Sequence, residues 1–132
     1  MRKIWIPINI TNSHWTLVYV SIEKQDAEYH VVVKYYDGLG GTGTEYTNRV
    51  SEYLQLQFKQ RGRHSLKLSI ETIAVDNCPT QNDQWECGVH LIHTVRDLLL
   101  DITPSHRSAV ALQVYREHIC DVILRGYISP RI

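Results

Sequence analysis

A cysteine at the junction between a polar loop and an apolar helix is the first residue in this sequence that could do chemistry. Cys87 follows the polar stretch 76–86 and opens the segment 87–100, which is apolar on most sides. Free N–H groups and the macrodipole at a helix start lower the pKa of a thiol and favour the thiolate. Gly88 has no side chain, so a substrate backbone can come close beside the sulfur. The same position also suits a cysteine that packs as a small hydrophobic residue, so the thiol alone does not establish catalysis.

An imidazole and a carboxylate are expected to meet at one end of a hairpin. His14 directly precedes the β-branched and aromatic segment 15–23, and Asp37 ends a similar segment, 29–37. In an antiparallel pair the start of one strand lies beside the end of the next. A carboxylate that holds an imidazole, which in turn polarises a thiol, is the general nucleophile–base–orienter arrangement.

Gln81 is the fourth candidate, six positions ahead of Cys87. Its side-chain amide and the Cys87 backbone N–H could together stabilise an oxyanion. Taken singly, each residue also has an ordinary interpretation. His14 suits a strand edge, Asp37 before glycine suits a turn, and Gln81 suits the surface. Only their joint occurrence favours catalysis.

The hydrophobic periodicity predicts the elements that must position these groups. The order β-β-β-α-β-α-α, with the strands early, predicts an α+β fold in which helices pack on a sheet. Pro7 places the first strand at an edge or a bulge. Strands are expected at 3–10, 15–23, 29–37 and 66–75, and helices at Thr44–Arg61, 87–100 and about Ser108–Arg125.

Composition narrows the class of protein. The 132 residues suit one domain, spanning 1–132. Fourteen basic residues balance fourteen acidic ones without a basic cluster, which argues against a nucleic-acid partner. No apolar run is long enough to span a bilayer. Three cysteines are an odd, sparse set, which predicts reduced thiols in an intracellular compartment.

Three quoted stretches carry a resemblance to a known family. "IPINITNSHWTLVYV", "YYDGLG" and "CPTQNDQWECGVHLI" together resemble the catalytic half of the SUMO-specific cysteine proteases, the ubiquitin-like-protein-processing group related to adenovirus protease. The resemblance covers about residues 4–100, in the order His, Asp, Gln, Cys. It includes the six-residue spacing from glutamine to cysteine and a tryptophan directly after the histidine.

The resemblance implies a papain-like or adenain-like core, with a mixed or antiparallel sheet and a central helix that carries the nucleophile. It implies hydrolysis, without a cofactor, of a Gly–X peptide or Gly–lysine isopeptide bond at the C-terminus of SUMO, NEDD8 or ubiquitin. The roles it implies are Cys87 as nucleophile, His14 as general base and acid, Asp37 as orienter, Gln81 in the oxyanion hole, and Trp15 as a wall of the channel for the modifier's C-terminal glycines.

The sequence also departs from the family pattern. Glu86 stands where the family commonly has aspartate, and the hairpin between His14 and Asp37 looks long. The usual N-terminal subdomain is not apparent before the first strand. We therefore expect an uncovered flank, with Trp5 its most exposed residue, and either self-association or a partner chain that supplies the missing part.

Other classes of function stay open. An acetyltransferase-type effector uses an equivalent triad on this scaffold, and a catalytically impaired domain would only bind a modifier. A zinc site at Cys78, Cys87, His90 and His93 is disfavoured because the spacing fits no common finger, so no metal is expected. Of the two histidines, one is expected to be packed and the other solvated. The location is expected to be the nucleus or cytoplasm, or a host cell for an effector.

Overall fold

A mixed sheet forms the centre of the molecule. The computed structural model describes residues 1–62, 66–76, 78–81 and 85–125. Strands β1 to β4 lie in the order β1-β2-β3-β4. The elements in chain order are β1 (Arg2–Ile10), β2 (His14–Gln25), β3 (Glu28–Tyr36), α1 (Thr44–Gln60), β4 (Lys67–Ala74), α2 (Cys87–Leu99) and α3 (Ala109–Arg125).

The first three strands form an antiparallel meander, and the fourth is parallel to its neighbour. β1 pairs with β2, and β2 with β3, through short turns that contain Thr11, Asn12 and Asp26 at positive φ. The connection through α1 then brings β4 beside β3 in parallel, as expected for a strand–helix–strand crossover. The α+β prediction is confirmed, and the sheet is mixed rather than antiparallel. Pro7 lies on β1, at an edge of the sheet.

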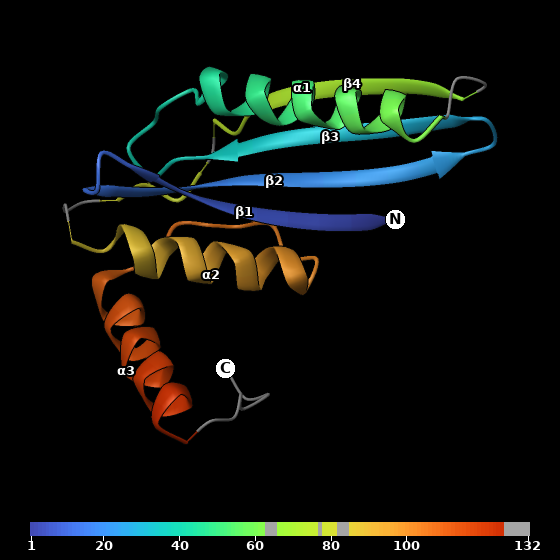
Figure 1. Ribbon diagram of the computed structural model, residues 1–132. Helices are drawn as coiled ribbons and strands as arrows, with labels where there is room; N and C mark the ends of the chain where they lie inside the picture. Colours follow the sequence, from blue (N-terminus) through green and yellow to red (C-terminus); the bar gives the residue numbers. More distant parts are fainter. Residues whose placement is uncertain (63–65, 77, 82–84, 126–132) are drawn as a thin grey trace.

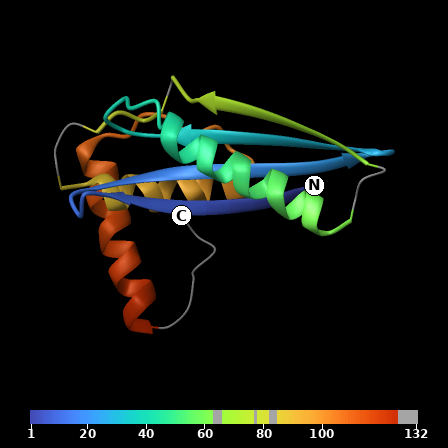
Figure 2. The same cartoon turned by 45° about the horizontal axis from the view of Figure 1, so that its top comes forward.

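Helices α1 and α2 cover opposite faces of the sheet (Figures 1 and 2). Alternation along β2 provides a core for each face. Val18 and Val20 belong to the cluster beneath α1, whereas Leu17 and Tyr19 belong to the cluster beneath α2. The sheet is therefore buried from both sides along its two central strands, and its ends are free to carry loops.

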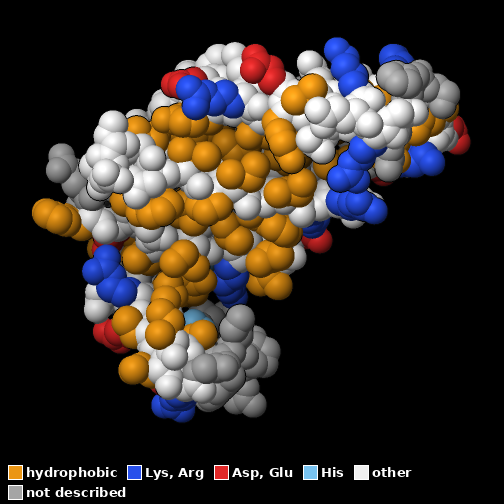
Figure 3. Space-filling view, viewed as in Figure 1, with side chains coloured by type: hydrophobic (Ala, Val, Ile, Leu, Met, Phe, Trp, Pro, Cys, Tyr) orange, Lys and Arg blue, Asp and Glu red, His pale blue; other side chains and the backbone are white. Residues whose placement is uncertain are grey.

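The expectation for Trp5 is wrong. Its ring packs on Tyr19, with centroids 5.9 Å apart, within the cluster that α2 covers. Trp5 alternates with Ile4, which lies on the opposite face and is 41% exposed. Figure 3 shows hydrophobic side chains gathered across the middle of the molecule, over the strands and α2. Of these two neighbours on β1, Ile4 is therefore the exposed one.

Helix α3 extends away from the sheet and meets the rest of the molecule mainly near α2 (Figure 1). Its buried Tyr115 contacts the ring of His93, with centroids 4.3 Å apart. Asp97 on α2 is buried and forms an ion pair with Arg107 in the connecting segment. His93 Nδ1 lies 3.4 Å from an Asp97 oxygen, so the expectation of one solvated histidine is wrong. His90 is also buried.

Candidate active site

The hairpin brings an imidazole and a carboxylate together at one end of the sheet. His14 is the first residue of β2, and Asp37 directly follows β3. Nε2 of His14 lies 2.7 Å from Oδ1 of Asp37, and both side chains are largely buried. An ionised carboxylate can only accept a hydrogen bond, so Nε2 carries the proton and donates the hydrogen bond to Asp37. Nδ1 is then left as an acceptor, the state that a general base requires.

The loop after β3 holds the carboxylate of Asp37 from its other side. The backbone N–H of Leu39 donates to Oδ1 at 2.8 Å, and that of Gly41 donates to Oδ2 at 3.1 Å. A Cβ atom on Gly41 would lie 2.3 Å from Oδ2, so only glycine allows this approach. Together with His14, these donors satisfy a buried carboxylate and fix its orientation.

Cys87 begins α2 at the same end of the sheet. Its side chain is 7% exposed and borders a small cavity of about 20 Å³. The residue before it, Glu86, makes no side-chain cap and instead lies 3.7 Å from Arg116 on α3. The free N–H groups of the first turn are therefore not occupied by that carboxylate. Trp15, Gly38 and Gln81 border the same cavity.

Gln81 is anchored to the loop that carries Asp37. Its backbone N–H donates to the carbonyl of Gly38 at 2.9 Å, and the residue is 9% exposed. A Cβ atom on Gly38 would lie 3.1 Å from Cβ of Gln81, tighter than an ordinary contact. The two loops therefore pack closely at the cavity. The interpretation of Gln81 as an ordinary surface residue is wrong, since it is buried beside the thiol.

Two tryptophans present their rings to solvent near Cys87. Trp15 is 41% exposed, and a Cβ atom on Gly88 would lie 4.0 Å from its Cδ1. Trp15 therefore lies against the first turn of α2. Trp85, two residues before Cys87, is 86% exposed. The sequence reasoning gave Trp85 no role, although a large aromatic in an otherwise polar loop is a usable signal.

Cys78 is a second thiol that borders the cavity. Burial raises the pKa of Cys78 to about 11, and the negative charge of Asp37 adds to the effect. Burial likewise raises the pKa of neighbouring Tyr36 to about 12. Cys78 is therefore a neutral thiol near pH 7 and a poor nucleophile. Cys120, in contrast, is exposed on α3.

In the described part of the chain, no group of three or more His, Cys, Asp or Glu side chains is arranged to hold a metal ion. None of the helices in the same ranges is long and apolar enough to cross a membrane.

Comparison with known proteins identifies the family. The sequence profile of the Ulp1 protease family, C-terminal catalytic domain, matches residues 1–121. The chain belongs to the Ulp1 protease family. Ubiquitin-like-specific protease 1 from Saccharomyces cerevisiae is 23% identical over 123 residues, which cover 90% of this chain and 18% of the yeast protein.

Solved structures agree with the fold expected of the Ulp1 protease family. A structure of the SUMO protease Ulp1 with its catalytic cysteine oxidised to a sulfonic acid superposes with a TM-score of 0.60 and 22% identity. A second, with that cysteine oxidised to a sulfinic acid, gives a TM-score of 0.59 and 20% identity. Each match covers 94% of this chain and 53% of the Ulp1 chain. The chain thus spans about half the length of those structures.

Proposed function

We propose that this domain is a cysteine protease that cleaves the bond after the C-terminal glycine of SUMO or another ubiquitin-like modifier. The scissile bond is a Gly–X peptide bond or an isopeptide bond to lysine. The observation that carries the proposal is the 2.7 Å hydrogen bond between His14 and Asp37, at the end of the sheet where Cys87 begins α2. Membership of the Ulp1 protease family and the yeast relative support the substrate class.

The proposed reaction uses these groups in sequence. Nδ1 of His14 takes the thiol proton, and the Cys87 sulfur attacks the glycine carbonyl carbon. The backbone N–H of Cys87 and the amide of Gln81 stabilise the oxyanion that forms. His14 returns its proton to the leaving amine, which departs from a thioester. Water then attacks the thioester, His14 accepts its proton, and the free modifier and thiol are released.

The size of the cavity supports a preference for glycine. The cavity of about 20 Å³ beside Cys87 has no room for a large side chain. Gly88 has no side chain of its own that would block a substrate backbone. Trp15 is available to pack along a narrow glycine backbone. The proposed setting is intracellular, where ubiquitin-like modifiers and their conjugates occur and where cysteines stay reduced.

A panel of modifier probes tests the proposal. SUMO, NEDD8 and ubiquitin, each with a C-terminal electrophile, are incubated with the protein, and adducts are read by intact mass. We expect one modifier to form a stoichiometric adduct on Cys87 and the matching fusion to be cleaved. Cys87→Ala should abolish both, whereas Cys120→Ala, which alters an exposed cysteine, should leave both unchanged. An adduct on Cys120 with Cys87 unmodified would overturn the proposal.

A further inference from the structure

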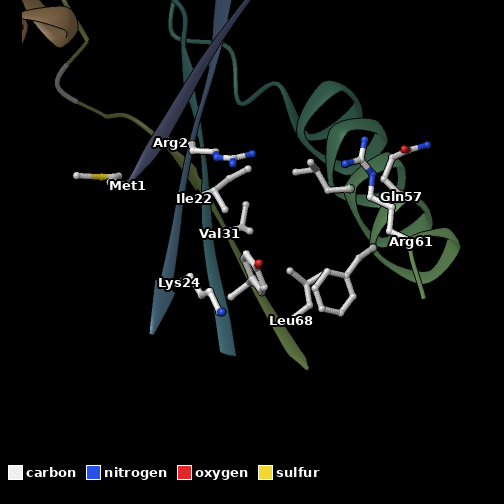
Figure 4. A pocket seen from close by; sticks show the side chains of 11 residues that line it. Met1, Arg2, Ile22, Lys24, Val31, Gln57, Arg61 and Leu68 are labelled. Carbon is white, nitrogen blue, oxygen red and sulfur yellow. The ribbon is translucent and has the colours of Figure 1, made fainter. Parts of the chain in front are cut away.

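A second cavity lies at the other end of the sheet, between the strands and the C-terminal half of α1 (Figure 4). Its volume is about 340 Å³, within the range of about 300–1,000 Å³ that is usual for small-molecule sites. Its walls are apolar and come from four elements: β2, β3, α1 and β4. The residues that form them are Ile22, Val31, Leu54, Phe58 and Leu68.

Three cations border this cavity and no acid does. Arg2, Lys24 and Arg61 are among its lining residues. Figure 4 shows the side chains of Arg2, from β1, and Arg61, just after α1, pointing toward each other from opposite sides of the cavity. None of the three forms an ion pair with a carboxylate in the described ranges. Uncompensated positive charge at the mouth of an apolar cleft attracts an anion.

The nearest polar groups do not cancel this charge. Glu28 at the start of β3 is already 3.3 Å from Lys67. Gln57, which also borders the cavity, donates its amide to Gln60 at 3.3 Å. The site therefore combines an apolar interior with two guanidinium groups at one mouth. Such groups bind carboxylate or phosphate oxygens in pairs.

We propose that this cavity binds an amphipathic organic anion, with an apolar body of about ten carbons and a carboxylate or phosphate head. The body lies against Leu54, Phe58 and Leu68, and the head is held between Arg2 and Arg61. A single cavity of about 340 Å³ with two guanidinium groups at its mouth suits one small ligand. A polypeptide would instead bury a broad surface of about 800 Å² on each partner.

This site is separate from the thiol. Ile22 and Lys24 lie about eight to ten residues along β2 from His14, which at 3.3 Å per residue is roughly 30 Å. The proposal therefore does not depend on the proposed protease activity. Loss of Cys87 should leave ligand binding intact, and loss of ligand binding says nothing of the thiol.

Titration with decanoate, decyl phosphate and the neutral decyl maltoside tests the proposal. Binding to the whole chain is followed by calorimetry and by amide chemical shifts. We expect saturable one-to-one binding below about 1 mM for at least one anion, with shifts concentrated at Ile22, Val31 and Leu68. The two anions distinguish a carboxylate from a phosphate head. Equal affinity for the maltoside, or shifts spread over the whole spectrum, would overturn the proposal.

Charge variants locate the head group. The double variant Arg2→Gln, Arg61→Gln removes both guanidinium groups from exposed positions and should weaken anion binding about tenfold or more. Arg49→Gln is the matched control, because Arg49 is exposed on α1 and does not border the cavity. Unchanged affinity in the double variant would overturn the proposal. So would binding of only an acidic peptide, with neither small anion bound.

Discussion

Asp37 is the residue whose environment is most fully specified. One of its oxygens accepts from His14 and from the N–H of Leu39, and the other accepts from the N–H of Gly41. An asparagine amide would direct its NH₂ group at one of these donors. It would therefore lose a hydrogen bond as well as the negative charge that stabilises an imidazolium.

We expect Asp37→Asn to lower kcat/KM on a modifier fusion by about 10²–10⁴-fold, and less than Cys87→Ala does. The measurement is cleavage rate with a fluorogenic modifier substrate, after circular dichroism has shown that the variant folds. Asp76→Asn is the control, since Asp76 is an exposed loop aspartate. Activity of Asp37→Asn within threefold of the unaltered protein would contradict the proposed role of the carboxylate.

Cys78 gives the protein an alkaline limit. Its pKa is about 11 in the fold, whereas an unfolded thiol has a pKa of about 8.5–9. Between these values the unfolded chain loses its proton and the folded chain keeps it, so the free energy of unfolding falls as pH rises from about 9 to 11. Below about pH 9, ionisation of Cys78 does not reduce the free energy of unfolding.

Urea denaturation at pH 8.5 and at pH 10.5 measures this effect. Between the two pH values, the free energy of unfolding of the unaltered protein should fall by about 1–2 kcal/mol more than that of Cys78→Ala. Cys120→Ala should behave as the unaltered protein, because that thiol is exposed. Tyr36, with a pKa raised to about 12, contributes above pH 10 in all three proteins. Equal losses in the unaltered protein and Cys78→Ala would show that the thiol ionises as freely in the fold as outside it.

At the scale of elements, the loop after β3 connects the sheet to the site. Gly41 provides one of the donors to Asp37 and has no room for a side chain. We expect Gly41→Ala to lower kcat by about tenfold or more, because a displaced carboxylate misorients His14 and small misplacements are costly. Thr42→Ala changes the next, exposed residue of this loop and should be nearly neutral. If the two variants cleave equally fast, the loop does not orient the pair.

Most elements could be predicted from the sequence, because the spacing of apolar residues along each of them was clear. The alternation of Ile4, Ile6 and Ile8 gave β1, and the segments around His14 and Asp37 gave the hairpin. The change from a polar loop to an apolar segment at Cys87 correctly predicted a helix start. The alternation also predicts the strand 66–75, but it does not predict the parallel pairing of that strand with β3.

What failed depended on tertiary packing. Alternation places Trp5 opposite Ile4, but it cannot say which face of the sheet a distant helix covers. That depends on α2, which starts more than 80 residues later. The partial burial of Cys78 against Tyr36 and that of His93 against Tyr115 likewise depend on residues far away in the sequence. Neither contact has a signal in the local sequence.

At the scale of the whole molecule, the face of β1 that carries the isoleucines predicts association between copies of the chain. Ile4 is 41% exposed, and Ile6 and Ile8 are only partly buried on the same face. Pro7 removes a backbone donor from the strand edge, so two copies would meet through this face rather than by edge pairing. A second copy of the chain is the partner that we predict.

Light scattering coupled to size exclusion at micromolar concentration measures the mass of the species in solution. We expect a mass above 15.4 kDa for the unaltered protein and a mass near it for Ile4→Glu. Leu56→Glu, at an exposed position of α1, is the control and should associate as before. A 15.4 kDa species for the unaltered protein would contradict self-association.

The meander has a consequence for the order of folding. His14 and Asp37 are 23 residues apart within three strands joined by tight turns, whereas Cys87 is 73 residues from His14. Contacts that are close in sequence form earlier, because closing a long loop costs more entropy. We expect Val33→Ala, in the meander core, to slow refolding, and Leu98→Ala, on α2, mainly to speed unfolding in stopped-flow experiments. The reverse assignment would refute this order. In the expected order, the imidazole–carboxylate pair is assembled before any thiol lies beside it, and the nucleophile is the last of the three groups to take its place.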